Sequence, residues 1–157
     1  MTSPVASLPL HRRIVPPAYL LAAIVLMVAL DRYVPVMDFE TSALRWVGGV
    51  TILAGVGLAA WGATTFRRAG TPVRPFEEAT ALVTVGPFRW TRNPMYLGML
   101  AVLAGTWLAL GSLVPLFVLP AFYLLIRHWF IGHEEAAMAE RFGERFGDYC
   151  RRVRRWV

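Results

Sequence analysis

Residues 44–66, LRWVGGVTILAGVGLAAWGATTF, decide the fold class. A helix needs about 20 consecutive apolar residues to cross a bilayer, and this stretch is long enough. Gly55, Ala59 and Ala63 recur every four residues, so they share one face of the helix. Small side chains on one face allow a second membrane helix to approach closely. The stretch therefore predicts a spanning helix that packs through its small residues.

The whole chain has the composition of a membrane protein. Of its 157 residues, 57% are hydrophobic and the mean hydropathy is +0.51, whereas soluble domains contain roughly 45–50% apolar residues. Gly111 and Ser112 separate two apolar runs, and Pro120 predicts a kink in the later one. We expect one all-α integral membrane domain, residues 1–157, with about four transmembrane helices and a charged cytoplasmic tail that contains a helix. The expected spans are residues 17–35, 44–66, 94–110 and 113–131, and the tail is residues 132–157.

The basic residues indicate the topology. All 16 are Arg, and the net charge is +6. With both termini in the cytoplasm, only Arg32 and Arg45 fall on the other side, which satisfies the positive-inside rule. Because the arginines flank apolar runs, they favour anionic lipid head groups over nucleic acid as a partner. We expect a bacterial inner-membrane protein whose long connection, residues 67–92, meets the tail on the cytoplasmic side.

The densest polar motif lies in residues 82–98, LVTVGPFRWTRNPMYLG. Gly86 and Pro87 predict a turn. Asn93 suits the N-cap and Pro94 the first position of the third span. The start of that helix offers free N–H groups and a positive dipole end, which favour a carboxylate or phosphate, and Arg92 would strengthen the site.

A second motif, His133-Glu134-Glu135, follows the fourth span. Two carboxylates at the negative end of a helix dipole suit a cationic ligand. The first motif also contains the aromatic residues Phe88, Trp90 and Tyr96, which would line the middle of the site and favour a cation over a ring face. The two motifs together suggest a ligand with separated charges, such as S-adenosylmethionine. Beyond them, residues 136–146 predict a helix with Met138, Phe142 and Phe146 on one face, lying on the membrane or packed on the bundle.

Other chemistry has little support in the sequence. Cys150 is the single cysteine, so the chain can form no internal disulfide and no cysteine metal cluster. The three His residues and the carboxylates lack metal-ligand spacing, so we expect no metal site.

The two motifs and their order resemble the isoprenylcysteine carboxyl methyltransferase family and its phospholipid N-methyltransferase relatives. The resemblance covers residues 66–157 and includes the motif of residues 82–98, Glu134-Glu135, Phe142-Gly143, Phe146, Tyr149 and residues 153–156. It implies methyl transfer from S-adenosylmethionine to a membrane-embedded or lipid-like acceptor. The implied cofactor-binding residues are Leu82, Val83, Phe88, Asn93, Pro94, Tyr96 and Glu134, which Arg92 and Gly98 of the same motif complete.

Three positions differ from the family's pattern. Asn93 replaces a common His, Phe146 replaces a common Tyr, and Phe130 replaces the Arg thought to hold a substrate carboxylate. Arg127, one helical turn earlier, is the expected substitute and therefore a catalytic candidate. Glu135, or His133, is the candidate that assists deprotonation of an amine acceptor.

Several alternatives stay open at this point. The acceptor is a prenylcysteine-type carboxylate, a lipid amine, a fatty acid or a quinone-like head group, so both O- and N-methylation fit. A small transporter or channel subunit is a rival, although no acidic residue lies deep in a predicted span. A non-catalytic membrane adaptor is another. The sequence does not indicate the oligomeric state.

Overall fold

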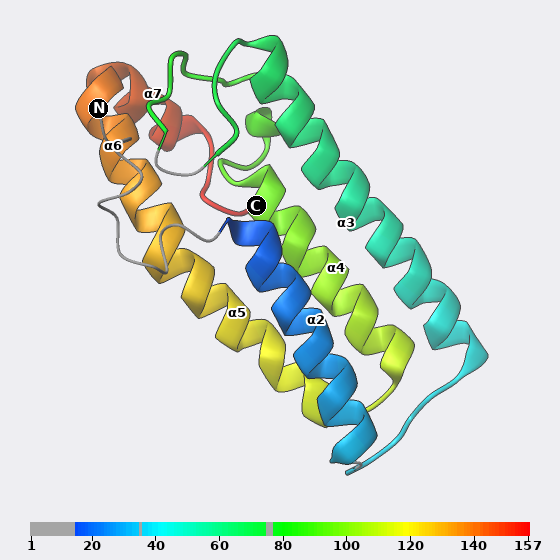
Figure 1. The fold of residues 1–157 in the computed structure, drawn as a ribbon. Coiled ribbons are helices and arrows are strands. Elements are labelled where there is room, and N and C mark those ends of the chain that lie inside the picture. The colour runs from blue at the N-terminus through cyan, green and yellow to red at the C-terminus, as the bar shows by residue number, and fades with distance from the viewer. Residues whose placement is uncertain (1–14, 35, 75–76) are drawn as a thin grey trace, which may run out of the picture.

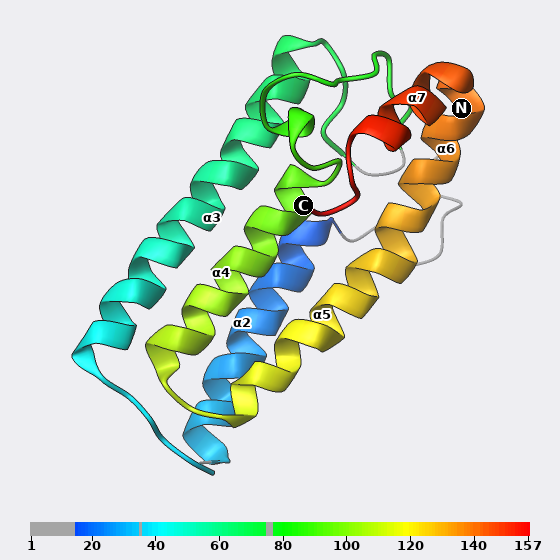
Figure 2. The same ribbon diagram turned by 180° about the vertical axis from the view of Figure 1, so that it is seen from behind.

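A computed structural model describes residues 15–34, 36–74 and 77–157. Within these ranges the protein is helical with irregular connections, and the extended pairing is limited to a β-bridge between Asp38 and Ser112. Three long helices lie side by side with a fourth, composite one (Figures 1 and 2). The first three are α2 (Pro16–Tyr33), α3 (Ser42–Arg68) and α4 (Pro94–Leu110). The predicted all-α fold is confirmed.

The fourth helix continues well beyond its predicted end. Residues from Ile126 to Gly132 keep right-handed helical dihedral angles, so Glu134 and Glu135 lie inside a continuous helix. The prediction that they lie at the end of the helix is wrong. Pro120 falls in the first turn of α5, after a 3₁₀ turn, where a missing N–H costs little. The segments are η3 (Val114–Phe117), α5 (Val118–Ile126), the π-helical η4 (Arg127–Ile131) and α6 (Gly132–Phe142).

The helices have the length and surface of membrane spans. Three helical segments, Pro16–Tyr33, Ser42–Arg68 and Val114–Phe142, are long and apolar enough to cross a bilayer, and α4 is a shorter apolar helix. Large apolar side chains such as Leu21, on α2, and Leu53, on α3, are 63% and 73% exposed. Such exposure suits contact with lipid chains, and the protein is an integral membrane protein.

Helix α3 packs on α4 backbone to backbone. A Cβ added at Gly55 would lie 2.6 Å from the Gly98 carbonyl oxygen, and one added at Gly48 would lie 2.5 Å from that of Gly105. No side chain larger than hydrogen fits at these distances. The predicted small-residue face is therefore correct for Gly55 and for Ala59, which touches Gly98. Its main repeat, however, is the seven-residue spacing of the buried Gly48, Gly55 and Gly62.

The C-terminal tail folds as two helices and not as one. Gly143 has a φ of +52°, a left-handed conformation that favours glycine, and it ends α6 at Phe142. Helix α7 (Glu144–Arg152) turns back toward the bundle and buries Phe146. The predicted continuous helix over residues 136–146 is therefore wrong at Gly143.

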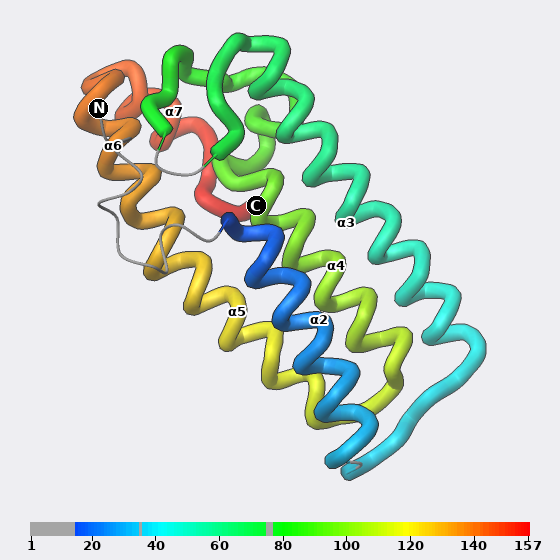
Figure 3. The backbone as a smooth tube through the Cα atoms, in the orientation of Figure 1, coloured from blue at the N-terminus to red at the C-terminus, as the bar shows by residue number. Residues whose placement is uncertain are grey.

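The long connection and the tail meet at one end of the bundle, as predicted. Figure 3 shows residues 77–93, α7 and the C-terminus gathered beside the start of α4. Arg32 lies in the last turn of α2, and Arg45 lies at the start of α3, at the opposite end. The polar groups of the chain are thus concentrated at the end where α4 begins.

The glycine contact predicts a sharp difference between two neighbouring positions. Gly55→Leu should destabilise the protein by about 1–3 kcal/mol or prevent its folding, because overpacking at a backbone contact has no room to relax. Gly57→Leu should have little effect, because a Cβ there meets nothing within 4 Å. Thermal unfolding of both variants in detergent measures this difference. Equal stability of the two variants would contradict the packing.

Candidate active site

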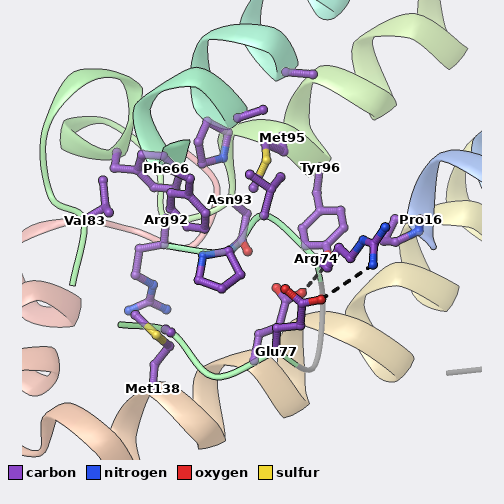
Figure 4. A pocket seen from close by; sticks show the side chains of 18 of the residues that line it. Pro16, Phe66, Arg74, Glu77, Val83, Arg92, Asn93, Met95, Tyr96 and Met138 are labelled. Atoms are coloured by element: carbon purple, nitrogen blue, oxygen red, sulfur yellow. Dashed lines mark hydrogen bonds and ion pairs between the residues drawn. The ribbon is translucent and has the colours of Figure 1, made fainter. Parts of the chain in front are cut away.

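A cavity of about 1040 Å³ opens between α3, α4, α6 and the long connection. This volume is at the upper end of small-molecule sites, which span roughly 300–1,000 Å³. Its polar part lies at the start of α4, where Figure 4 shows Arg92 and Tyr96 on opposite sides of Asn93. Its apolar part reaches between the helices and is lined by Leu20, Val56, Ala60, Met99 and Val102.

The start of α4 is held by the C-terminal residues 153–157, here called the C-terminal strap. The Arg155 carbonyl oxygen accepts hydrogen bonds from Thr91 Oγ1 at 3.1 Å and from Asn93 Nδ2 at 3.0 Å. The backbone N–H of Arg92 donates to the Arg154 carbonyl at 3.0 Å. Asn93 occupies the predicted N-cap position, but its side chain bonds the strap and does not cap the helix. Pro94 has no N–H and the Leu97 N–H donates to the Asn93 carbonyl, so the uncapped N–H groups of the first turn are those of Met95 and Tyr96.

Glu135 is the centre of an ion cluster. Its Oε1 lies 3.0 Å from Arg92 Nη2 and accepts from Arg155 Nε at 3.1 Å, and its Oε2 accepts from Arg155 Nη2. The bonds to Glu135 raise the pKa of the Arg155 guanidinium, so this group stays charged. Both carboxylate oxygens are thus occupied, and Glu135 links α6 to the strap. This arrangement does not suit the predicted role of Glu135 in proton transfer.

Arg92 has unused capacity for an anion. Its side chain is only 14% exposed, and its buried Nε has no hydrogen-bond partner among the described residues. A buried, unpaired donor on a charged group is costly unless a ligand satisfies it. Arg92 also lines the cavity beside the start of α4. The positive charge of the Arg92 guanidinium favours an anionic group of a ligand at this end of the cavity.

Glu134 and Tyr96 form the second polar wall. Tyr96 Oη donates to Glu134 Oε1 at 2.7 Å, which joins α4 to α6 across the cavity. Among the described residues, the hydrogen bond of Glu134 is made by Oε1 and leaves Oε2 for a ligand, and both side chains line the cavity. A carboxylate in this place suits a cationic or hydroxyl-bearing part of a ligand.

An aromatic wall completes the polar end. Phe88 stacks on Phe66 of α3, with ring centroids 4.7 Å apart. Tyr149 Oη donates to the Phe88 carbonyl at 2.7 Å, and burial raises the pKa of Tyr149 to about 12, so it stays a donor. Phe88 was a predicted site residue, whereas Phe66 and Tyr149 were not. Tyr149 belongs to the C-terminal motif of the family resemblance and could have been predicted from it. Nothing in the sequence around Phe66 indicated a place in the site.

The structure brings most of the predicted site residues together. Val83, Phe88, Arg92, Asn93, Pro94, Tyr96, Gly98, Glu134 and Glu135 all line the cavity. Gly98 also lies against the Gly55 carbonyl, so its main role is helix packing. Leu82 is not among the lining residues. Arg127 lies in a separate cleft with His128. It was predicted to share a helix face with Phe130 at α-helical spacing, but the π turn over Arg127–Ile131 changes that spacing. No set of three metal-ligating side chains comes together in the described part of the chain.

The ion cluster predicts that Glu135 contributes to stability. Glu135→Ala should cost about 1–3 kcal/mol, between the small value of an exposed pair and the larger value of a fully buried one. Asp148→Ala is the matched control, since it removes an exposed ion pair with Arg151 and should cost less than about 1 kcal/mol. Thermal unfolding in detergent compares the two. A smaller loss for Glu135→Ala than for Asp148→Ala would refute the proposed linkage.

Comparison with known proteins identifies the family. No curated protein sequence matches the chain significantly. The family model described as phospholipid methyltransferase matches residues 43–145, which is well over half of the chain. The matched region runs from α3 through the connection and α4 into the tail, so it contains both walls of the polar end. The chain therefore belongs to the phospholipid methyltransferase family and is an integral membrane methyltransferase.

Proposed function

We propose that this protein transfers the methyl group of S-adenosylmethionine to an amine in the head group of a lipid. One observation carries the proposal: a single cavity joins a polar end, at the start of α4, to an apolar part between the helices. The polar end suits a charged cofactor, and the apolar part suits an acyl chain. The volume of about 1040 Å³ is at the upper end of the roughly 300–1,000 Å³ found for small-molecule sites.

The polar end has the chemistry that the cofactor requires. The charge of the Arg92 guanidinium and the positive end of the α4 dipole suit a carboxylate. Glu134, held by Tyr96, suits an ammonium or a hydroxyl group. Val83 and the stacked rings of Phe66 and Phe88 suit an adenine. These groups fit the separated charges of S-adenosylmethionine.

The proposed mechanism depends on positioning. When bound, S-adenosylmethionine supplies an electrophilic methyl group, whose bond to sulfur breaks with both electrons going to sulfur. The walls of the cavity would hold the cofactor and the acceptor amine close together, so that proximity and orientation would supply much of the rate. His133 lines the same cavity and accepts the proton that the nitrogen releases. Glu135, held by two guanidinium groups, positions the strap.

An amine fits this site better than the carboxylate of a prenylcysteine. Phe130 is fully buried in the apolar core, and Arg127 lies outside the cavity, so neither provides the expected carboxylate ligand. The family description, phospholipid methyltransferase, supports the amine as well. Arg67 and Arg74 line the cavity and keep a carboxylate acceptor as the second candidate. The concentration of Arg at this end supports a cytoplasmic site, which we propose for a bacterial inner membrane.

Cofactor binding is the first test. Calorimetric titration of S-adenosylmethionine into detergent-purified protein should show binding, and Glu134→Gln should weaken it by about tenfold, or ~1.4 kcal/mol. Glu144→Gln, an exposed change on α7, should bind like the unmodified protein. No binding to folded protein in two detergents would refute the proposal and favour a transport or adaptor role.

Acceptor preference is the second test. Protein in vesicles should methylate phosphatidylethanolamine, and mass spectrometry should show the added methyl on the head group. N-acetyl-farnesylcysteine, offered in the same vesicles, tests the carboxylate candidate. Methyl ester formation without amine methylation would reject the amine and select O-methylation.

A further inference from the structure

A second cleft lies on the outer side of the fourth helix, apart from the methyl-transfer cavity. It is lined by Leu124, Arg127, His128, Gly132 and Arg155, and it shares no lining residue with the large cavity. Its polar side chains come from two segments distant in sequence, the π turn and the C-terminal strap. No role in methyl transfer accounts for it.

The cleft has more positive charge than its surroundings neutralise. Within the described residues, the Arg127 guanidinium makes no ion pair or hydrogen bond that the structure records. Arg155 uses its Nε and Nη2 on Glu135, which leaves its other donors free. Glu135 also forms an ion pair with Arg92, so its single negative charge is shared by two guanidinium groups. The charge of Arg127 adds to this excess of positive charge. This cluster suits a ligand that brings a negative charge.

The surface next to the cleft indicates where such an anion comes from. Leu124 is 58% exposed, and Phe117, two turns earlier on the same helix, is 66% exposed. Both residues lie in the segment Val114–Phe142, which is long and apolar enough to cross a bilayer and which also contains Arg127 and His128 of the cleft. A phosphate at the cleft with an acyl chain along α5 would satisfy both the charge and the apolar surface.

The π turn gives the cleft its shape. Helix η4 begins at Arg127, and a π turn places more residues in each turn than an α-helix does. Arg127 and His128 are consecutive and both exposed there, so both present donors on the outer side. Such turns occur often at functional sites.

We propose that this cleft binds the phosphate of an anionic phospholipid, separate from the methyl acceptor, and that the bound lipid stabilises the C-terminal strap. The link to the strap is Arg155, whose side chain lines the cleft and whose carbonyl oxygen holds Thr91 and Asn93. An anion that fixes Arg155 would also fix the start of α4. The lipid would thus stabilise the methyl-transfer site from outside the cavity.

Titration of phosphatidylglycerol into protein held in phosphatidylcholine nanodiscs, followed by native mass spectrometry, tests the cleft without a methylation assay. Arg127→Gln should weaken phosphatidylglycerol binding about fivefold, because it removes one head-group contact near the membrane surface. Arg145→Gln is the control, since it removes an exposed Arg from α7 at the same end of the bundle. It should change binding less than about twofold, and Arg127→Lys should retain most of the affinity.

Two outcomes would overturn the proposal. Equal losses for Arg127→Gln and Arg145→Gln would show diffuse attraction with no built site. Displacement of the lipid by millimolar inorganic phosphate would assign the cleft to a soluble anion. Thermal unfolding in neutral nanodiscs checks that both variants are folded. The binding measurement uses no S-adenosylmethionine, so its result does not depend on whether the protein binds this cofactor.

Discussion

Helix α3 is held to the rest of the bundle by contact between two backbones. Gly48 and Gly55 lie against the carbonyls of Gly105 and Gly98, and a Cβ at any of these positions would lie within 2.6 Å of a backbone oxygen. Since α3 packs mainly on α4, this contact determines the position of the C-terminal end of α3 relative to α4. Gly62, at the same spacing, brings α3 against Pro94 and Met95, and thus beside the start of α4. The apolar wall of the cavity therefore depends on the absence of side chains at a few positions.

The polar end of the cavity is assembled from distant parts of the chain. The strap supplies the carbonyl that holds Asn93, and Glu135 of α6 holds the strap through Arg155. Tyr96 joins α4 to Glu134, and Tyr149 joins α7 to Phe88. Each of these bonds crosses between elements, so the site forms when α4, α6 and α7 come together. A change in the strap should therefore affect ligand binding although no strap residue lines the large cavity.

Hydropathy was sufficient to predict the four apolar helices but not the end of the fourth or the helices of the tail, because membrane spans need long apolar runs whatever their packing. The predicted third span, residues 94–110, coincides with α4, where Pro94 and Gly111 mark both ends. Local patterns failed where a distant partner or an unusual turn decides the outcome. The Asn93 amide bonds a carbonyl 62 residues away, which no capping rule indicates. Arg127 was placed by α-helical spacing, which its π turn does not obey. Glu135 was predicted to assist proton transfer. The sequence did not show that Arg92 and Arg155 form ion pairs with it, because these residues approach Glu135 only in the folded chain.

The central claim is that the cofactor binds where the start of α4 meets the C-terminal strap. Hydrogen–deuterium exchange, measured with and without S-adenosylmethionine in detergent, tests it most directly. Residues 86–97 and 149–157 should both exchange more slowly when the cofactor is bound, because they form and support the same polar end. Unchanged exchange in both segments at saturating S-adenosylmethionine would contradict the account.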